Sequence, residues 1–555
     1  MKVSNFIVRV LLSMAAMAVT MTAGAGSFTV DGIHYTTSGS NASVTYSVNV
    51  GQPHKTLTVA NIPPQVTYNN NTYTVTSIGF GAFYLCKALE TLTLPETLTT
   101  IGNNAFYGCS SLKHVDLPQS LRSIAMWGFR DSGLTEIFIP KNLTSLGSDV
   151  FTRCPLDHIT VEAGNSTYDS RDNCNAIIRT ADGVLLKGSN NTVIPYGVTT
   201  IGQYAFSLCK KLNISTVPSS VTAIHEYAFD MCDNITTFTI PESVKELRNN
   251  VFDYCNNLET VYLPASLTEI KPSSLGDIRL FAYCPKLHTL VVDEANPVYD
   301  SRDNCNAIII TATNELIEGI PTSIIPDGVV KIGYDAFSGK TPLKSVNIPS
   351  SVEFINEFAF YSNDSLRSIT FSEPSALKAI GSMSFAYNKQ LEELLFPDGL
   401  DSITNYAAQS CPLLKRVVLP STVKYIGAGC FSYCNEIHAF YSKIKEPTEV
   451  VYGGTNGNSI ASNVLQNATL YVPKGSADKY RAIADWQVFP NIVEIDYDNL
   501  RGDLNHDYEI NTADVSLLYG NVLDGTYNTE SDVNDDGAVN SGDISILYDI
   551  IISNN

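Results

Sequence analysis

The chain has 555 residues, of which 44% are hydrophobic and 16% charged, and its formal net charge is -21 at pH 7. This length exceeds what one compact core accommodates, so the chain forms either several domains or a repeat array. The acidic balance excludes nucleic acid as a partner, because binding a phosphate backbone requires clustered Lys and Arg.

Residues 1–25 predict a secretory signal peptide. Lys2 and Arg9 are followed by an apolar run, and Ala-Gly-Ala occupies residues 23–25. This order indicates cleavage after Ala25. No later segment has the roughly 20 consecutive apolar residues that span a bilayer. We therefore expect a secreted, extracellular protein, free or attached to the cell surface, without a transmembrane segment.

Residues 77–437 repeat one phrase, as in LETLTLPETLTTIGNNAFYGCSS and ITTFTIPESVKELRNNVFDYCNN. Most copies follow one another after 22 to 25 residues, and all but one are anchored by a phenylalanine. Such a period predicts a β-rich leucine-rich-repeat solenoid of α/β repeat coils, in which each coil buries its apolar edge against its neighbours. The anchors are Phe83, Phe106, Phe129, Phe151, Phe206, Phe229, Phe252, Phe281, Phe337, Phe360, Phe385 and Phe431, with Ala408 in the one other slot.

Two of the steps between anchors are longer and contain the same insertion. Its sequence is NSTYDSRDNCNAII at residues 165–178 and NPVYDSRDNCNAII at 296–309. We place the two duplicated inserts at 163–190 and 294–320. Both ends of the solenoid need capping segments, since an uncovered terminal coil exposes its apolar edge. We expect a β-rich N-terminal cap at 26–76 and a C-terminal cap at 438–497, with Trp486 in the core of the latter.

The spacing of the cysteines argues against disulfides. Nine of the twelve lie three residues after an anchor and so form a ladder with one rung per coil. Side chains in such a ladder point the same way, whereas a disulfide needs Cβ atoms turned toward each other. We expect buried free thiols that act as small hydrophobes. The nine are Cys86, Cys109, Cys154, Cys209, Cys232, Cys255, Cys284, Cys411 and Cys434.

The short sequence motifs IP, IG and AF..C at these offsets resemble those of the BspA-like subclass of leucine-rich repeats. The resemblance covers about residues 27 to 497, in thirteen copies. It implies a surface protein that binds a host protein, another cell or a polymer. The position two before the anchor varies widely and is aromatic in five coils, which suggests a binding stripe. The alternative is partial packing between coils. The five are Trp127, Tyr204, Tyr227, Phe358 and Tyr406.

A different duplication occupies residues 498–555, and within residues 501–555 eleven acidic residues accompany one basic residue. The loops 503–514 and 532–543 each carry oxygen side chains at positions 1, 3, 5, 9 and 12, with the carbonyl of position 7 as a further ligand. This donor set suits Ca²⁺, so the sequence predicts two calcium sites. Their ligands are Asp503, Asn505, Asp507, Glu509, Asn511 and Asp514 in the first loop, and Asp532, Asn534, Asp536, Ala538, Asn540 and Asp543 in the second.

Each loop leads into one apolar helix and has no full helix before it, which excludes a complete EF-hand. Over about residues 501 to 552 this arrangement resembles a type I dockerin, a small α-helical calcium-binding domain, and so implies a cohesin-type scaffold domain as partner. Two features depart from the pattern. Position 6 of the first loop is Tyr508 where the second has Gly537. The pairs Thr512-Ala513 and Ser541-Gly542 at positions 10 and 11 are small but not diagnostic. The alternative to a cohesin is a calcium-stabilised tail that packs against the cap.

The sequence contains no sign of catalytic machinery. The eight His residues are scattered, and no H-E-x-x-H, G-x-S-x-G or P-loop motif occurs. We expect a monomeric, non-enzymatic binding protein whose solenoid face recognises protein or polysaccharide and whose tail attaches to a cohesin. The alternative is a dockerin-borne carbohydrate-active or structural component of an extracellular multiprotein complex.

Overall fold

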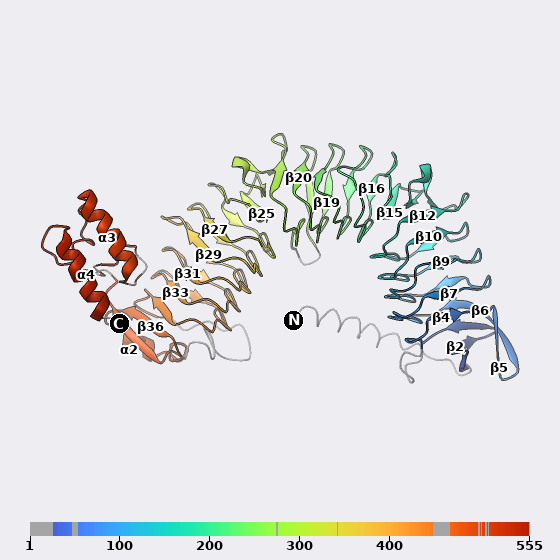
Figure 1. The fold of residues 1–555 in the computed structure, drawn as a ribbon, viewed down its shortest axis with the longest axis horizontal. Coiled ribbons are helices and arrows are strands. Elements are labelled where there is room, and N and C mark those ends of the chain that lie inside the picture. Colours follow the sequence, from blue (N-terminus) through green and yellow to red (C-terminus); the bar gives the residue numbers. More distant parts are fainter. Residues whose placement is uncertain are drawn as a thin grey trace. The chain divides into compact units, whose positions relative to one another are not determined.

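The computed structural model describes residues 26–46, 54–273, 276–340, 342–447, 467–497, 500, 502–505, 508 and 510–553. The expected signal peptide lies outside them. The chain divides into two compact units, Met1–Ser323 and Ile324–Asn555. Within each unit the coils stack side by side (Figure 1). None of the helices described is both long and apolar enough to cross a membrane.

The first unit opens with a small antiparallel layer. In it, β1 pairs with β2, β2 with β3, and β5 with β6. Strand β6 then pairs in parallel with β8, the first short strand of the repeat ladder. The layer thus covers the apolar edge of the first coil. Its strands are β1 (Ser27–Val30), β2 (Ile33–Ser38), β3 (Asn41–Val44), β5 (Gln65–Tyr68) and β6 (Asn71–Ile78).

The coils of the first unit contribute short strands to two parallel ladders. In β10, Ile137 and Ile139 are buried and alternate with exposed residues, because successive side chains point to opposite faces. Pro140 follows that strand and cannot continue its hydrogen bonding. One ladder is interrupted twice. Its first part is β4 (Val59–Asn61) with β7 (Thr91–Thr93), its second is β10 (Glu136–Ile139) with β12 (His158–Val161), and its third is β18 (Thr237–Thr239), β20 (Thr260–Leu263) and β22 (Thr289–Val292). The other is interrupted by the first insert. Before it, β8 (Thr100–Ile101), β9 (Ser123–Ile124) and β11 (Ser145–Leu146) pair in that order, and after it β16 (Thr200–Ile201), β17 (Ala223–Ile224), β19 (Glu246–Arg248) and β21 (Glu269–Lys271) do so.

Both inserts fold in the same way, as a short strand, a 3-10 turn and a two-stranded antiparallel hairpin. The hairpin strands β14 and β15 pair with a register shift after Ile177, and β24 and β25 with the equivalent shift after Ile308. The first insert has β13 (Tyr168–Asp169), η1 (Arg171–Asn173), β14 (Ala176–Arg179) and β15 (Val184–Gly188). The second has β23 (Tyr299–Asp300), η2 (Arg302–Asn304), β24 (Ala307–Ile310) and β25 (Glu315–Gly319).

The second unit repeats the two-ladder pattern and ends in helices. In the described residues α-helices begin only at Ala477, so the return stretches of the described coils are turns. One ladder has two separate parts. In the first, β27 (Ser345–Ile348) pairs with β29 (Ser368–Phe371), and in the second the order is β31 (Glu393–Leu395), β33 (Arg416–Leu419), β35 (Ala439–Ser442), β36 (Thr469–Pro473) and β37 (Asn491–Ile495). The other comprises β26 (Lys331–Ile332), β28 (Phe354–Ile355), β30 (Ala379–Ile380), β32 (Ser402–Ile403) and β34 (Tyr425–Ile426). The helices are α2 (Ala477–Arg481), η4 (Ala484–Trp486), α3 (Thr512–Asp524) and α4 (Ser541–Ser553).

The anchoring phenylalanines form the centre of each column. Phe206 and Phe229 stack with ring centroids 5.4 Å apart, and Phe229 and Phe252 repeat that distance. In the second unit Phe337 and Phe360 stack at 5.0 Å. All these rings are buried. Trp486 is fully buried and in edge contact with Tyr480, so its expected position in a core is confirmed.

The cysteines are free and buried, as expected, but they are more than small hydrophobes. The Cys232 thiol donates to the carbonyl of Phe206, the anchor of the preceding coil, at 3.3 Å. In a coil without cysteine, Asn363 stands at the same offset and its amide donates to the carbonyl of Phe337 at 2.9 Å. The ladder position therefore supplies a donor to a buried carbonyl, which would be costly to leave unpaired.

We expect these thiols to resist modification in the native protein. Burial raises the pKa of both Cys86 and Cys154 to about 11, and the thiolate is the reactive form. Alkylation at mildly alkaline pH should therefore label the unfolded protein fully and the folded protein very slowly. Mass spectrometry of the non-reduced protein provides a second check, because a bond between Cys86 and Cys109, or between Cys232 and Cys255, contradicts the ladder.

Candidate functional site

The five aromatic residues of the expected stripe share an unusual backbone conformation. Trp127, Tyr204 and Tyr227 have φ of 59°, 53° and 56°, and Phe358 and Tyr406 have 59° and 60°. A positive φ is rare for residues other than glycine and common for Asn. Asn104 and Asn250 adopt φ of 57° and 59° at the same place in other coils. The position is thus a left-handed turn, which the sequence period did not reveal.

In the first unit the structure brings three of these side chains into one group. The guanidinium carbon of Arg130 lies 5.4 Å from the ring centroids of both Trp127 and Tyr204. Tyr204 also stacks on Tyr227, with centroids 4.7 Å apart and planes 7° apart. All three rings remain half-buried. We call Trp127, Arg130, Tyr204 and Tyr227 the aromatic cluster.

The other two aromatic residues of the expected stripe belong to the second unit and form separate contacts. Phe358 packs against Tyr334 and Tyr361, each with a centroid distance of 5.5 Å. Tyr406 lies against Gly429 of the next coil, where an added Cβ would be 2.6 Å from the tyrosine ring. Phe358 thus contacts one ring of the preceding coil and one of its own coil, and Tyr406, which is 40% exposed, contacts the following coil.

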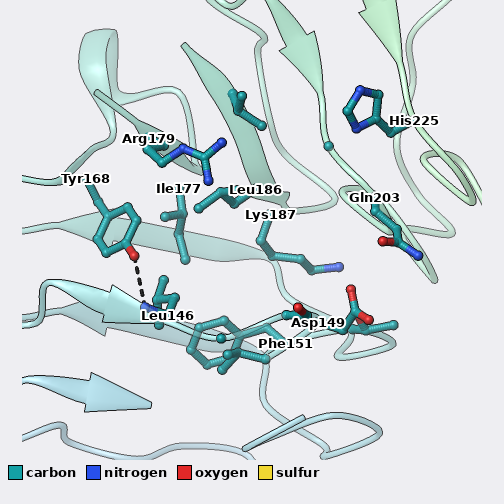
Figure 2. A pocket seen from close by; sticks show the side chains of 16 residues that line it. Leu146, Asp149, Phe151, Tyr168, Ile177, Arg179, Leu186, Lys187, Gln203 and His225 are labelled. Atoms are coloured by element: carbon teal, nitrogen blue, oxygen red, sulfur yellow. Dashed lines mark hydrogen bonds between the residues drawn. The ribbon is translucent and has the colours of Figure 1, made fainter. Parts of the chain in front are cut away.

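A cavity of about 300 Å³ lies near the aromatic cluster, between β11 and the first insert. Leu146, Ile177 and Leu186 form part of its wall. Figure 2 shows polar side chains from the preceding coil, from the insert and from the following coils around the same space. These polar residues are Asp149, Arg179, Lys187, Gln203 and His225.

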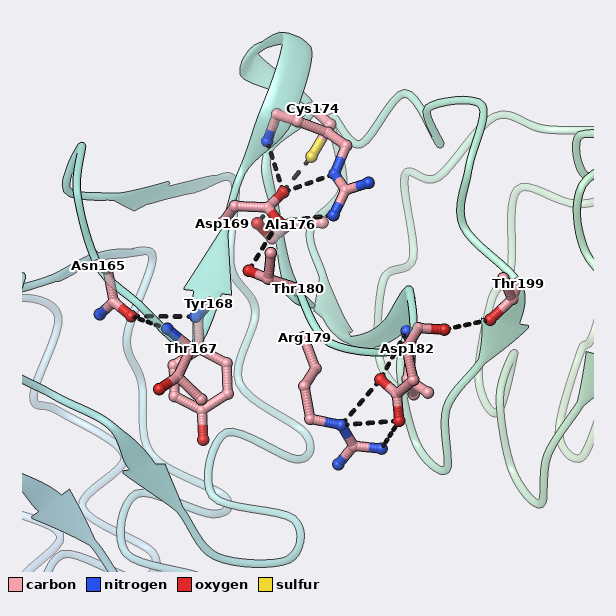
Figure 3. Close-up of polar contacts among 12 residues, drawn as sticks. Asn165, Thr167, Tyr168, Asp169, Cys174, Ala176, Arg179, Thr180, Asp182 and Thr199 are labelled. Carbon is pink, nitrogen blue, oxygen red and sulfur yellow. Dashed lines mark hydrogen bonds and ion pairs between the residues drawn. The ribbon is translucent and has the colours of Figure 1, made fainter.

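Hydrogen bonds within the first insert hold the cavity wall in place (Figure 3). Arg171 forms two bonds to the Asp169 carboxylate, at 2.7 and 2.6 Å, and Arg179 is paired with Asp182 at 2.8 Å. The hydroxyl of Tyr168 accepts from the Leu146 amide at 2.9 Å. That last bond ties the insert to the end of the β11 ladder.

Asp253, which follows the anchor Phe252, is a buried carboxyl in the core of the first unit. Its oxygens accept from the Asn250 amide at 2.6 Å and from the Ala282 backbone at 3.1 Å. Burial raises its pKa to about 8, although nearby Arg279 opposes that shift. The folded state therefore holds a proton that the unfolded chain, with a pKa near 3.8, releases.

We expect stability to fall as pH rises through this window, from about 4 to about 8, because the folded state binds more protons there. The slope is at most about 1.4 kcal/mol per pH unit for one group. Asp253→Asn removes the titrating group, so the variant should gain stability relative to the native protein as pH rises to 8, with no further change above it. Thermal unfolding midpoints across this range test the prediction, and parallel profiles for the two proteins contradict it.

In the second loop of the tail, two buried carboxylates close the loop onto its own backbone. Asp532 accepts from the amides of Gly537 at 2.8 Å and Asp536 at 3.0 Å. Asp543 accepts from the amide of Asn540 at 2.9 Å. These two acids hold positions 1 and 12. Of the other expected ligands in this loop, Asn540 is half-buried and the rest are exposed, namely Asn534, Asp536 and Ala538.

The first loop is closed in the same way. Asp514 accepts from the amides of Leu504 and Asn511, both at 2.8 Å, and Asp503 accepts from the amide of Tyr508 at 2.8 Å. Asn505 is exposed and Asn511 half-buried. The expected ligands Asp507 and Glu509 lie outside the described residues. Across the described part of the chain, no three acidic, His or Cys side chains gather as a metal site. The donors in both loops are nevertheless oxygens, the ligands that Ca²⁺ prefers.

Helices α3 and α4 pack together through Leu518, Leu547 and neighbouring apolar residues. Asn511 caps α3 in a capping box with Asp514, and Gly525 ends the helix with φ of 66°. Both helices also carry exposed apolar side chains at matching positions, 29 residues apart as the loops are. The exposed pairs are Leu517 and Ile546, Tyr519 and Tyr548, and Leu523 and Ile552.

Tyr508 contacts the segment 438–497, the expected C-terminal cap. Its ring lies 5.8 Å from that of Tyr441 on β35 and 5.6 Å from that of Tyr497, and the Lys443 ammonium is 4.8 Å from its centroid. Its φ is 65°, while Gly537 at the same loop position has 85°. Tyr508 therefore adopts a glycine-like backbone and places an aromatic ring on the cap.

Residues 64–176, 187–301 and 318–438 match the family described as BspA type Leucine rich repeat region, in six copies. These ranges exceed half of the chain. It belongs to the BspA-type leucine-rich-repeat family. Residues 501–551 match the dockerin type I domain. Both expected resemblances are confirmed, and both matched modules are non-catalytic.

Among solved structures, this BspA-type chain is similar to a leucine rich cell surface protein from Faecalibacterium prausnitzii A2-165, with 24% identity, a TM-score of 0.40 and coverage of 78% of this chain and 96% of that one. The pneumococcal vaccine antigen PcpA has 17% identity, a TM-score of 0.37 and coverage of 85% and 98%. A leucine-rich repeat protein from Bacteroides ovatus ATCC 8483 has 21% identity, a TM-score of 0.33 and coverage of 77% and 100%. No curated protein matches the chain.

The interpretation of the sequence as BspA-type repeats did not predict the cavity or the contacts of Arg130 with Trp127 and Tyr204. A signal for the cavity was present, however. The two inserts share NCNAII but differ afterwards, where Arg179 and Lys187 of the first correspond to Ile310 and Glu318 of the second. Comparing the copies position by position singles out these side chains.

Proposed function

We propose that this chain is a secreted or cell-surface binding protein in which the solenoid, capped by residues 26–76 and 438–497, recognises a protein or a polysaccharide. The aromatic cluster carries the proposal. Half-buried aromatic rings around an arginine are the residue types enriched at binding hot spots. They offer apolar contact area at a low cost in side-chain entropy, because each ring has few rotatable bonds.

The test is a host-protein and glycan binding array probed with residues 26–497. Asparagine fits the left-handed backbone, since Asn104 and Asn250 occupy that position elsewhere. Tyr204→Asn should therefore preserve the fold and weaken binding, while Met383→Asn, at the same repeat position outside the expected stripe and with φ of 54°, is the matched control. A ligand bound equally by both variants contradicts the role of the cluster, and no ligand on the array contradicts the binding function.

We further propose that residues 498–555 bind two Ca²⁺ ions and attach the protein to a cohesin-type domain. The first ion would be held by Asp503, Asn505, Asp507, Glu509, Asn511 and Asp514, and the second by Asp532, Asn534, Asp536, Ala538, Asn540 and Asp543. Calcium orders each loop, and the loops set the start of α3 and α4. The exposed apolar pairs on those helices support a partner surface, because such side chains in a small domain gain stability when covered.

A second candidate role for the tail is favoured by Tyr508. Its contacts with Tyr441, Tyr497 and Lys443 support a module that packs on its own cap and braces the end of the solenoid. A pull-down of cohesin domains with segment 498–555, with and without EDTA, separates the two roles. Calcium-dependent capture supports attachment within an extracellular complex. Lack of capture, together with a lower unfolding temperature of residues 26–497 than of the longer chain, supports the brace.

A further inference from the structure

The cavity beside the first insert exists because the insert interrupts a ladder. Strands β8, β9 and β11 pair in parallel, and the ladder stops at Leu146. It resumes with β15, which pairs with β16 through Val184 and Leu185. At the end of the first ladder, the Leu146 amide bonds to the Tyr168 hydroxyl instead of a following strand. A gap between two ladders is thus part of the architecture, and Figure 2 shows the side chains around it.

The lining combines apolar walls with polar groups that can donate and accept. Lys187 is 4% exposed, and among the described residues its ammonium donates one hydrogen bond, to the Ser207 carbonyl at 3.2 Å. An ammonium has three donors, so two remain for another acceptor. Burial lowers the pKa of His225, which leaves a neutral imidazole with one donor and one acceptor. Asp149 adds a carboxylate and Gln203 an amide at the rim.

The charges in this lining are balanced. The Arg179 guanidinium is paired with Asp182, and Lys187 is accompanied by Asp149 across the same cavity. Burial also raises the pKa of Asp149. The site therefore offers no excess of either charge, which favours a neutral polar ligand over an anion or a cation.

The aromatic cluster adjoins the cavity through two of the cavity's lining residues, Asp149 and Gln203. The indole N–H of Trp127 donates to Asp149 at 3.4 Å, and Gln203 immediately precedes Tyr204. A ligand unit in the cavity would thus have neighbouring units beside half-buried aromatic rings. A pyranose ring matches both environments, because its C–H faces are apolar and the hydroxyls around its edge donate and accept. A volume of about 300 Å³ lies at the small end for ligand pockets and suits one ring.

The second insert provides an internal comparison. It repeats the same frame, with Arg302 bound twice to Asp300 and the Tyr299 hydroxyl accepting from the Ile270 amide at 2.9 Å. The residues at the positions that line the first cavity differ. Ile310 and Glu318 replace Arg179 and Lys187. Two residues before the anchor that precedes the insert, Arg279 replaces Asp149. The frame therefore folds without the polar set of the first insert.

From these observations we infer that the cavity at the first insert binds one neutral hexopyranose unit of a glycan. The inference rests on the proposed binding function of the solenoid and specifies its ligand class. Lys187, Gln203, His225 and Asp149 contact the hydroxyls, Leu146 and Leu186 contact the ring, and the aromatic cluster contacts the adjoining sugar.

Ligand-detected NMR and calorimetry on the full chain test this inference, with methyl glucoside, methyl mannoside, methyl galactoside and a short neutral glycan as probes, and glucuronate and galacturonate as charged counterparts. We expect binding of at least one neutral probe. Gln203→Ala and Asp149→Asn should each weaken it about tenfold, the typical effect of losing one hydrogen bond. Met383→Asn, which lies two residues before the anchor Phe385 and has φ of 54°, is the control at an equivalent repeat position and should leave the affinity unchanged.

Several outcomes overturn the inference. They are no binding of any neutral probe, binding of the uronates alone, or unchanged affinity in both cavity variants. Gln203 is exposed, so its truncation tests the site even if Asp149→Asn disturbs folding, which thermal melts would show. A protein ligand on the binding array together with no sugar binding here would refute the sugar site and leave the broader binding function standing.

Discussion

Titrating the full chain with Ca²⁺ is expected to reveal two sites of unequal affinity, the tighter one in the second loop. Both loops need a positive φ at position 6, where the first has Tyr508 and the second Gly537. A left-handed backbone costs a non-glycine residue about 1 to 2 kcal/mol, which the first site must meet from its binding energy. Calorimetry should therefore show the weaker event abolished by Asp503→Ala and the tighter one by Asp532→Ala.

Loss of the second site should also cost more helicity. Crowded carboxylates repel one another without a cation, so folding of the tail is coupled to binding. Circular dichroism of segment 498–555 should gain helix with calcium and lose it with chelator, and Asp532→Ala or Asp543→Ala should reduce the gain more than Asp503→Ala or Asp514→Ala. Asp549→Asn, in α4 outside both loops, is the control. Absence of calcium uptake, or a tighter first loop, contradicts the assignment or its ranking.

Replacing Phe229 by Ala is expected to destabilise the first unit by about 3 to 5 kcal/mol, the range for truncating a buried phenylalanine. The ring is fully buried and packs on Phe206, Phe238 and Phe252 at 5.1 to 5.4 Å. The space left by the missing ring cannot collapse easily, because the backbone hydrogen bonds between strands keep the two neighbouring coils in place. Denaturant unfolding followed by hydrogen exchange measures the loss and shows where it spreads.

The matched control is Phe138→Ala in the same unit. Phe138 alternates with buried isoleucines on β10 and is 45% exposed, so its loss should change stability by no more than about 0.5 kcal/mol. In a column where each coil depends on its neighbours, the damage from Phe229→Ala should be greatest in the adjacent coils. Equal effects of the two substitutions would refute the stacked-ring core.

The sequence alone determined everything that recurs at a constant spacing. The anchoring phenylalanines, the cysteine ladder, the duplicated inserts and the two acidic loops were all visible as periods. A sequence repeat identifies equivalent positions in successive coils, and residues at equivalent positions of a solenoid stack on one another. For that reason the fold, the buried anchors and the free thiols could be predicted without any knowledge of spatial contacts.

The tertiary structure decided what arises between positions that are not equivalent. Arg130 bridges Trp127 and Tyr204 although they belong to coils that are not consecutive, and Tyr508 reaches Tyr441 from a different domain type. The cavity forms where one ladder stops and another begins. Left-handed backbone at the aromatic positions likewise follows from turn geometry. Such features depend on distances across the stack, and a one-dimensional pattern contains no information about those distances.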